Sequence, residues 1–389
     1  MTTQFLHGVE VQEVDDGVRP IKTIKSSVIA IVGTAPEAKA EDFPVDTPVL
    51  ISGSRIKAAK LGTQGTLPLA LQVIFDQVGA SVVVVRVDEG ADDAATLVNV
   101  IGGTDAEGNR SGIQTLLNCD AVCHVKPRIV LAPGFTHEKT VAKALEPISK
   151  QLKAVALVDC SEGAPGDAIT YRKEFADKRT MVLYPGVRVY NRNISAEEVS
   201  PLSSVTAGLI AKIDYEKGFW WSPSNQQILN ILGTSLPIDH ELGDLNSTSN
   251  LLNENHITTV IHDEGYRLWG NRTTTNDTKW VFINVVRTAD LINDSLKRAH
   301  LWAVDRNLTA TYFEDVIEGV NNYLRHLTTI GAILGGNCWA DPDLNTADKL
   351  KEGIAYFNFD FTPPTPAEHI VFQSKLSDAY FKNVLSGDS

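Results

Sequence analysis

Two short segments of the chain contain residue types that a serine hydrolase would use. Residues 154–163 (AVALVDCSEG) place Asp159 at the end of a β-branched run, and residues 233–237 (GTSLP) place Ser235 after a glycine. A serine nucleophile needs an imidazole that takes its proton. None of the nine histidines lies between Asp159 and Ser235, where the order Asp, His, Ser would require one. We therefore assign no catalytic residue, and a soluble α/β serine hydrolase that uses Ser235 remains the alternative hypothesis.

The other candidate ligands are incomplete sets. Cys119, Cys123 and His124 have a spacing compatible with one helical turn, but a zinc site needs a fourth ligand and Asp120 is unconvincing in that role. The chain has no Gly-Lys-Ser or Gly-Lys-Thr, and residues 29–36 (IAIVGTAP) lack the second and third glycines of a dinucleotide fingerprint. We expect no bound metal and no cofactor.

Aromatic residues are concentrated in two turn-rich stretches, residues 218–225 (GFWWSPSN) and 264–273 (EGYRLWGNRT). Trp220, Trp221 and Trp269 could form a platform for a sugar ring. They could equally be core or subunit contacts, which the lack of a convergent polar set favours.

Composition narrows the class of protein. With 389 residues, 43% of them hydrophobic and 21% charged, the chain can bury a substantial core in two or three domains. A net charge of −13 argues against nucleic acid as a partner. Residues 1–17 lack the pattern of a secretory signal, so we expect synthesis in a cytoplasm. The longest apolar runs, residues 28–32 and 82–85, are too short to span a bilayer, and we expect no direct membrane insertion.

The periodicity of apolar residues predicts an α/β fold, α+β overall. Strand patterns at 26–33, 48–52 and 80–87, with a helix over 67–78, indicate a small α/β unit. Parallel strands joined by crossover helices are expected next, with strands at 128–133, 154–159 and 180–184 and helices at 140–152 and 168–176. Helices at 288–305 and 311–330 follow, and then strands at 355–361 and 369–376 separated by a proline-rich break.

Both ends of the chain contain a strand pattern separated from the body. Residues 7–14 (HGVEVQEV) alternate Val9 and Val11 with polar residues, and residues 369–376 lie beyond the prolines. A lone strand has unpaired backbone groups on both edges. Each segment can fold back on its own body, or it can complete a sheet in another copy.

Several strings in this order resemble the tail sheath proteins of contractile-tailed bacteriophages and R-type pyocins. They cover most of the chain: NVIGGTDAEGNRSGIQTLL (99–117), KPRIVLAPG (126–134), GFWWSPSN (218–225), GYRLWGNRT (265–273), VRTAD (286–290), HLWAVD (300–305) and ADPDLN (340–345). The resemblance runs from about residue 5 to 385.

This resemblance implies a division of the chain. It comprises an N-terminal linking arm (1–22), a small N-terminal domain (23–98), a central subtilisin-like α/β domain without a catalytic triad (99–275), a C-terminal helix-plus-sheet domain (276–362) and a C-terminal linking arm (363–389). A subtilisin-like fold that is not a protease would explain the partial motifs at Asp159 and Ser235.

The resemblance also implies a non-enzymatic, mechanical function. Such subunits form hexameric rings stacked helically around a tail tube, and contraction drives the tube through a cell envelope. The expected partners are further copies of the chain, the tube protein, and baseplate and tail terminator proteins. The product would be a virion tail or a phage-tail-like particle assembled in a bacterial cytoplasm.

Two groups of residues are implied to make contacts between subunits. The terminal arms of such proteins join neighbours by strand addition, which points to the residues Val9, Val11, Phe357, Phe359, Phe361, Ile370 and Phe372. A short charged helix over 346–353 supplies candidates for contact with the tube, namely Lys349, Lys351 and Asp348.

Overall fold

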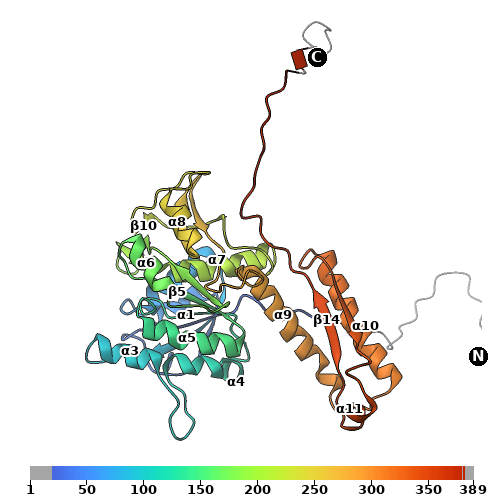
Figure 1. Cartoon of the computed structure of the whole chain (residues 1–389). Helices are drawn as coiled ribbons and strands as arrows, with labels where there is room; N and C mark the ends of the chain where they lie inside the picture. The colour runs from blue at the N-terminus through green and yellow to red at the C-terminus, as the bar shows by residue number, and fades with distance from the viewer. Residues whose placement is uncertain (1–19, 379, 382–389) are drawn as a thin grey trace, which may run out of the picture.

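A nine-stranded sheet forms the centre of the protein (Figure 1). The computed structural model describes residues 20–378 and 380–381. Along the sheet the strands are ordered β2 (Val49–Ser52), β3 (Ser81–Val87), β1 (Ile29–Thr34), β4 (Ile129–Leu131), β5 (Val155–Asp159), β6 (Thr180–Leu183), β11 (Ile257–His262), β12 (Tyr266–Trp269) and β9 (Gln226–Gln227). The pairings from β3 to β11 are parallel, as the sequence predicts for the strands that became β4, β5 and β6, and those at the two edges are antiparallel.

The sheet is continuous across residue 98, where the sequence suggested the end of a small α/β unit. Strand β1 pairs with β3 on one side and with β4 on the other, so residues 23–98 and 99–275 share one sheet. The periodicity of a single strand cannot reveal its neighbours, and that is why this continuity was not predicted.

Helices cover both faces of the sheet, which explains why the central strands β1, β4, β5 and β6 are buried at every position. Ile29 and Ile31 face a layer formed by α2 (Leu67–Gln77) and α7 (Leu202–Glu216). The alternate residues of β1 face the opposite layer, which contains α3 (Asp93–Ile101), α5 (Lys139–Leu152) and the 3₁₀ helix Gly112–Asn118.

Smaller elements surround this core. They are the helices α1 (Arg55–Ala59), α4 (Cys119–Cys123), α6 (Pro165–Arg172) and α8 (Thr248–Glu254), and a three-stranded sheet ordered β10 (Gly233–Thr234), β7 (Val187–Asn191) and β8 (Ala196–Ser200). Helix α6 begins earlier than the apolar pattern suggests, because Pro165 occupies its first turn and the Asp167 carboxylate accepts a hydrogen bond from the Ala164 amide.

The C-terminal part packs helices against a small sheet. It contains α9 (Ile283–Ala299), the 3₁₀ helix His300–Ala303, α10 (Ala310–Thr329), α11 (Ala347–Lys351) and a two-stranded antiparallel sheet of β13 (Gly336–Ala340) and β14 (Phe357–Phe361). Phe357, Phe359 and Phe361 share one face of β14, as expected, and are half-buried against a cluster from α9 and α10.

Buried ion pairs fix α9 to the central body. Arg287 donates two hydrogen bonds to the carboxylate of Asp214 on α7, at 2.8 and 2.6 Å, and both side chains are at least 95% buried. One turn further along, Asp290 receives a bidentate pair from Arg179 at 2.7 and 2.6 Å. Paired charges on one face of α9 therefore hold the C-terminal part on the body.

Asp294 extends this face by another turn. Its carboxylate lies 2.8 Å from the side chains of Lys126, Arg128 and Lys153. Burial by itself would raise the pKa of Asp294, but the hydrogen bonds from Lys126, Lys153 and Arg128 bring it well below its usual value. The carboxylate is thus held in its charged form between α9 and the central sheet.

We predict that Arg287→Ala destabilises the protein by about 3–5 kcal/mol, because it leaves the Asp214 carboxylate buried without a cation. Urea unfolding of the unassembled chain measures this loss. The matched control is Arg325→Ala, which removes an exposed pair with Glu318 and should cost about 0–1 kcal/mol. Equal losses for the two variants would contradict the role assigned to α9.

Candidate functional site

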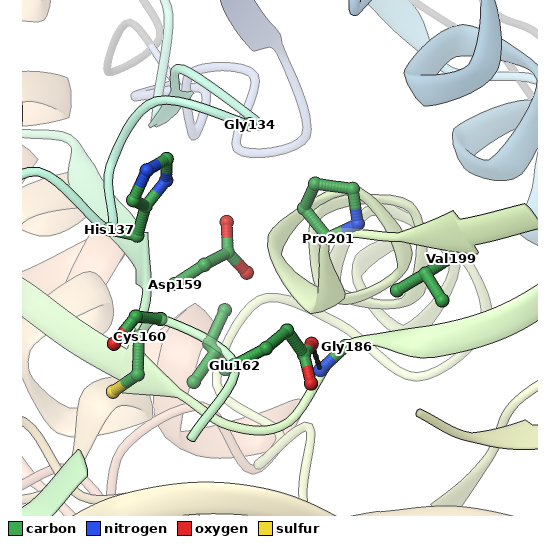
Figure 2. A pocket seen from close by; sticks show the side chains of 10 residues that line it. Gly134, His137, Asp159, Cys160, Glu162, Gly186, Val199 and Pro201 are labelled. Carbon is green, nitrogen blue, oxygen red and sulfur yellow. Dashed lines mark hydrogen bonds between the residues drawn. The ribbon is translucent and has the colours of Figure 1, made fainter. Parts of the chain in front are cut away.

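A cavity of about 270 Å³ lies at the carboxyl ends of β4, β5 and β6 (Figure 2). This is the edge at which open α/β sheets place their ligand sites. The residues that line it include His137, Asp159, Cys160, Glu162 and Pro201. The chemistry suggested by Asp159 and Ser235 must therefore be judged here.

Ser235 is engaged by a carboxylate. Its Oγ donates a hydrogen bond to Oε2 of Glu162 at 2.7 Å, while Oε1 of Glu162 accepts one from the Gly186 amide at 2.9 Å. Glu162 therefore ties β10 to the turn between β6 and β7. Sequence reasoning missed it, although its position three residues after Asp159 was a signal that it belongs to the same sheet edge.

Asp159 serves as a structural acceptor. Its Oδ1 accepts a hydrogen bond from the Ser203 amide at 2.8 Å, and Oδ2 accepts one from Thr136 Oγ1 at 3.3 Å. Burial raises the pKa of Asp159 to about 6, because these hydrogen bonds only partly offset the loss of solvent. The carboxylate positions the start of α7 beneath the cavity.

Asp159, His137 and Ser235 do not make a hydrolase triad. His137 lines the cavity, but the hydrogen-bond partner of Ser235 Oγ is Glu162. The Glu162 carboxylate accepts this hydrogen bond and a second one from the backbone amide of Gly186, which is the geometry of a structural contact between loops. The arrangement connects three loops at the sheet edge.

The cysteines and histidine considered as zinc ligands also have local roles. Cys119 is fully buried, which raises its pKa to about 12, and Cys123 Sγ donates to the Pro48 carbonyl at 3.3 Å. His124 ends α4 in the left-handed conformation. Within residues 20–378, 380 and 381 there is no group of three or more His, Cys, Asp or Glu side chains that could hold a metal ion.

The tryptophans considered as a sugar platform have separate neighbours. Trp220 packs edge-to-face on Phe219 in the core of the C-terminal part, and Trp221 lies beneath the ammonium group of Lys217. Trp269 contacts His240. Trp220 and Trp269 are half-buried packing contacts, whereas Trp221 is 47% exposed and lies outside a core.

The tube-facing candidates lie on α11, whose N-cap is Thr346. Lys349 and Lys351 occupy its last turn, and Asp348 its first. The Lys349 ammonium contacts Glu352 at 2.8 Å and its side chain is 44% exposed, so it can exchange this partner for another carboxylate.

Beyond β14 the chain leaves the body in an extended conformation (Figure 1). Residues 362–377 form neither helix nor strand, so the strand expected at 369–376 has no partner within the described chain. Its apolar side chains are exposed, with Ile370 at 66%, Phe372 at 90% and Leu376 at 96%. Val9 and Val11 lie outside the described residues.

Comparisons with known proteins agree with these features. The chain matches the phage tail sheath protein central domain over residues 108–274, the phage tail sheath C-terminal domain over 275–377 and the N-terminal region of tail sheath protein Gp18 domain III over 26–87.

Relatives match over nearly the whole length. A prophage major tail sheath protein of Pseudomonas aeruginosa strain UCBPP-PA14 is 40% identical, over 98% of this chain and 99% of the relative. The tail sheath protein of Escherichia phage P2 is 35% identical, over 99% and 98%. The fold is similar to the helical sheath of the anti-feeding prophage in its contracted state, with a TM-score of 0.72 at 22% identity, covering 96% and 100% of the two chains.

The matches over nearly the whole chain thus place it in the class of structural assembly proteins. The chain belongs to the family of phage tail sheath proteins. Its relatives are sheath subunits of contractile systems, so the mechanical role predicted from the sequence is confirmed and the hydrolase alternative is set aside.

We predict that Asp159 makes the protein less stable as pH rises from about 4 to 6. Its pKa is higher in the folded than in the unfolded state, so the folded state binds more protons in this window and loses stability as they dissociate. Asp159→Asn should remove this slope and raise the free energy of unfolding at pH 7 by up to roughly 3 kcal/mol. Urea unfolding of both proteins from pH 4 to 7.5 tests this, and parallel pH profiles would contradict it.

Proposed function

We propose that the chain is the protomer of a contractile sheath built from hexameric rings stacked helically around a tail tube, whose contraction drives the tube through a target envelope. The extended segment with Ile370, Phe372 and Leu376 exposed is the observation that supports it most directly. An apolar strand that leaves its own body is suited to join a second copy.

Strand addition would satisfy this segment in two ways. Its unpaired N–H and C=O groups would find partners along a sheet edge, and its apolar side chains would leave water. Burying a large side chain such as Phe372 or Leu376 contributes about 1.5–3 kcal/mol. Many such joints would together hold a tube of subunits without requiring extensive contact between the bodies.

The sheet of β13 and β14 is the receiver we propose. A two-stranded sheet is marginal alone, and the outer edge of β14 has no strand partner among the described residues. At the outer edge of β13, the side-chain amide of Asn321 on α10 already bonds the N–H and C=O of Cys338, at 2.7 and 3.1 Å. The aromatic side chains Phe357, Phe359 and Phe361 already form an apolar face beside α10, which an added strand would extend. Ile370 and Phe372 of one copy, and Val9 and Val11 of another, would supply the added strands.

The domain boundaries that fit this function are those of the sequence analysis. We propose linking arms at 1–22 and 363–389, a body of 23–98 and 99–275, and a C-terminal sheath domain at 276–362. The start of the C-terminal family match at residue 275 supports the third boundary.

We propose that α11 faces the tail tube through Lys349, Lys351 and Asp348. The helix projects from the end of the C-terminal domain, next to β13 and β14 (Figure 1). Mixed charge on a short exposed helix favours a polar contact that can be exchanged.

Further partners follow from this role. Baseplate and tail terminator proteins would bound the two ends of the tube of rings, and assembly would occur in a bacterial cytoplasm, into a virion tail or a phage-tail-like particle. Nucleic acid is not expected as a partner, given the net charge of −13. No helix within the described residues is long and apolar enough to cross a membrane.

We predict that deleting residues 1–17 or 367–389 leaves a folded monomer that does not polymerise, because the joints between copies are lost. Negative-stain microscopy and sedimentation measure tube formation, and circular dichroism checks the fold. Tubes formed by both truncated proteins would refute the arm hypothesis.

A point variant separates apolar strand pairing from arm length. The double substitution Phe372→Asp and Leu376→Asp should block tubes, whereas Lys375→Asp, on the same segment, should leave them intact.

We predict that Lys349→Glu with Lys351→Glu preserves sheath polymerisation but weakens binding to the tail tube about tenfold or more, since two charges are reversed at the contact. Co-sedimentation of sheath with purified tube protein measures this. Arg325→Glu, an exposed charge reversal on α10, is the control. Equal binding by all three proteins would exclude α11 from the tube contact.

A further inference from the structure

The root of the C-terminal arm is held against the body at two points. At the first, the side-chain amide of Asn284 on α9 donates a hydrogen bond to the Pro364 carbonyl at 3.2 Å and another to the Trp220 carbonyl at 3.0 Å. At the second, Glu368 meets the guanidinium of Arg272, whose Nε lies 2.8 and 3.0 Å from the two carboxylate oxygens. Nη2 of Arg272 contacts the same carboxylate.

Arg272 is oriented by the body before it meets the arm. Its guanidinium lies 5.8 Å from the centre of the Phe282 ring, and its Nη1 donates to Nε2 of His256 at 3.3 Å. On its other side, Nδ1 of His256 lies 3.0 Å from both the Thr273 carbonyl oxygen and Nη2 of Arg172, so contacts within the body hold the imidazole ring in place. A preoriented guanidinium fork binds a carboxylate with little loss of side-chain freedom.

His256 is suited to stay neutral in this position. Burial lowers its pKa, and the positive charges of Arg172 and Arg272 lower it further. A neutral imidazole can accept the hydrogen bond from Arg272, which an imidazolium could not. The receptor for Glu368 is therefore assembled from the body alone.

The peptide that leads from β14 to Glu368 is stiff. Residues 362–366 (TPPTP) contain three prolines, which favour an extended conformation with little freedom. Past Glu368 the apolar side chains become exposed, beginning with Ile370. The arm thus becomes free at residue 369, beyond the boundary at 362 that the proline-rich break suggested.

We propose that Arg272 and Glu368 form a latch that fixes the root of the C-terminal arm and thereby sets how far the arm reaches toward another copy. The inference rests on the proposed linking function of that arm. While the latch is closed, the arm reaches from residue 369. When it opens, the four residues 365–368 beyond the Asn284–Pro364 contact are released, which adds up to roughly 13 Å at about 3.3 Å per residue.

A latch of this kind suits a joint between moving bodies. The Arg272 and Glu368 side chains are each about one-third exposed, at 33% and 32%, so solvent weakens the pair and it can open without unfolding the core. The buried pairs of α9 would stay closed under the same load. Reach could then change while the body remains rigid.

Cleavage by a glutamate-specific protease tests the latch at Glu368 itself. The full-length, unassembled chain is digested, and mass spectrometry follows release of the fragment 369–389. Opening the latch exposes the peptide bond after Glu368, so Arg272→Ala should be cut there about three- to tenfold faster than the unsubstituted protein. Arg272→Lys, which keeps the charge but loses the fork, should give an intermediate rate.

Controls keep the result specific. Arg325→Ala should leave the rate at Glu368 unchanged, and cutting after Glu318, inside α10, should stay slow in every variant that remains folded. Equal rates at Glu368 in Arg272→Ala, Arg272→Lys and the unsubstituted protein would overturn the latch. Sedimentation of the same preparations after assembly reports tube formation separately, so loss of the latch and failure of the linking function give different results.

Discussion

The backbone N–H and C=O groups of an extended peptide cannot hydrogen-bond to each other and need a neighbouring strand as partner. This constraint governs the architecture of the chain. Within residues 20–361 nearly every strand belongs to a sheet that is covered by helices or by apolar side chains. The segment beyond Glu368 has neither kind of cover and exposes Phe372 and Leu376. A chain that folds so completely elsewhere and leaves an apolar strand in water is suited to assembly with copies of itself.

Two kinds of electrostatic contact divide the chain into a rigid body and a movable link. Arg287 and Asp214, with the other pairs along α9, are buried and strongly hydrogen-bonded, so removing one partner is costly. The pair between Arg272 and Glu368 is partly exposed and is worth much less. The order of these strengths lets the arm change its reach before the C-terminal domain separates from the body, which a contracting assembly requires.

Much of this was accessible from the sequence, because periodicity reports directly on burial. The β-branched runs that became β1, β3, β5 and β6 and the helix that became α10 were predicted within a few residues. Apolar runs do not encode strand order, so the single sheet joining β1 to β4 was not foreseen. Only part of the candidate site could be predicted: Asp159 and Ser235 stood out by residue type, but the contact of Ser235 with Glu162 depends on the fold. The same holds for the receptor formed by His256 and Arg272, whose residues only the fold brings together. The family resemblance gave the function, which no residue pattern alone specified.

The origin of the strand that meets each C-terminal sheet tests this account most directly. Tubes can be assembled from an equal mixture of ¹⁴N- and ¹⁵N-labelled chains that carry a photo-crosslinking residue in place of Phe372. After crosslinking and digestion, mass spectrometry identifies the isotope of each of the two joined peptides. The account predicts crosslinks to β13 or β14 in which the two peptides differ in isotope as often as random mixing allows. Crosslinks found only between peptides of the same isotope would show that the arm folds back on its own body and would contradict it.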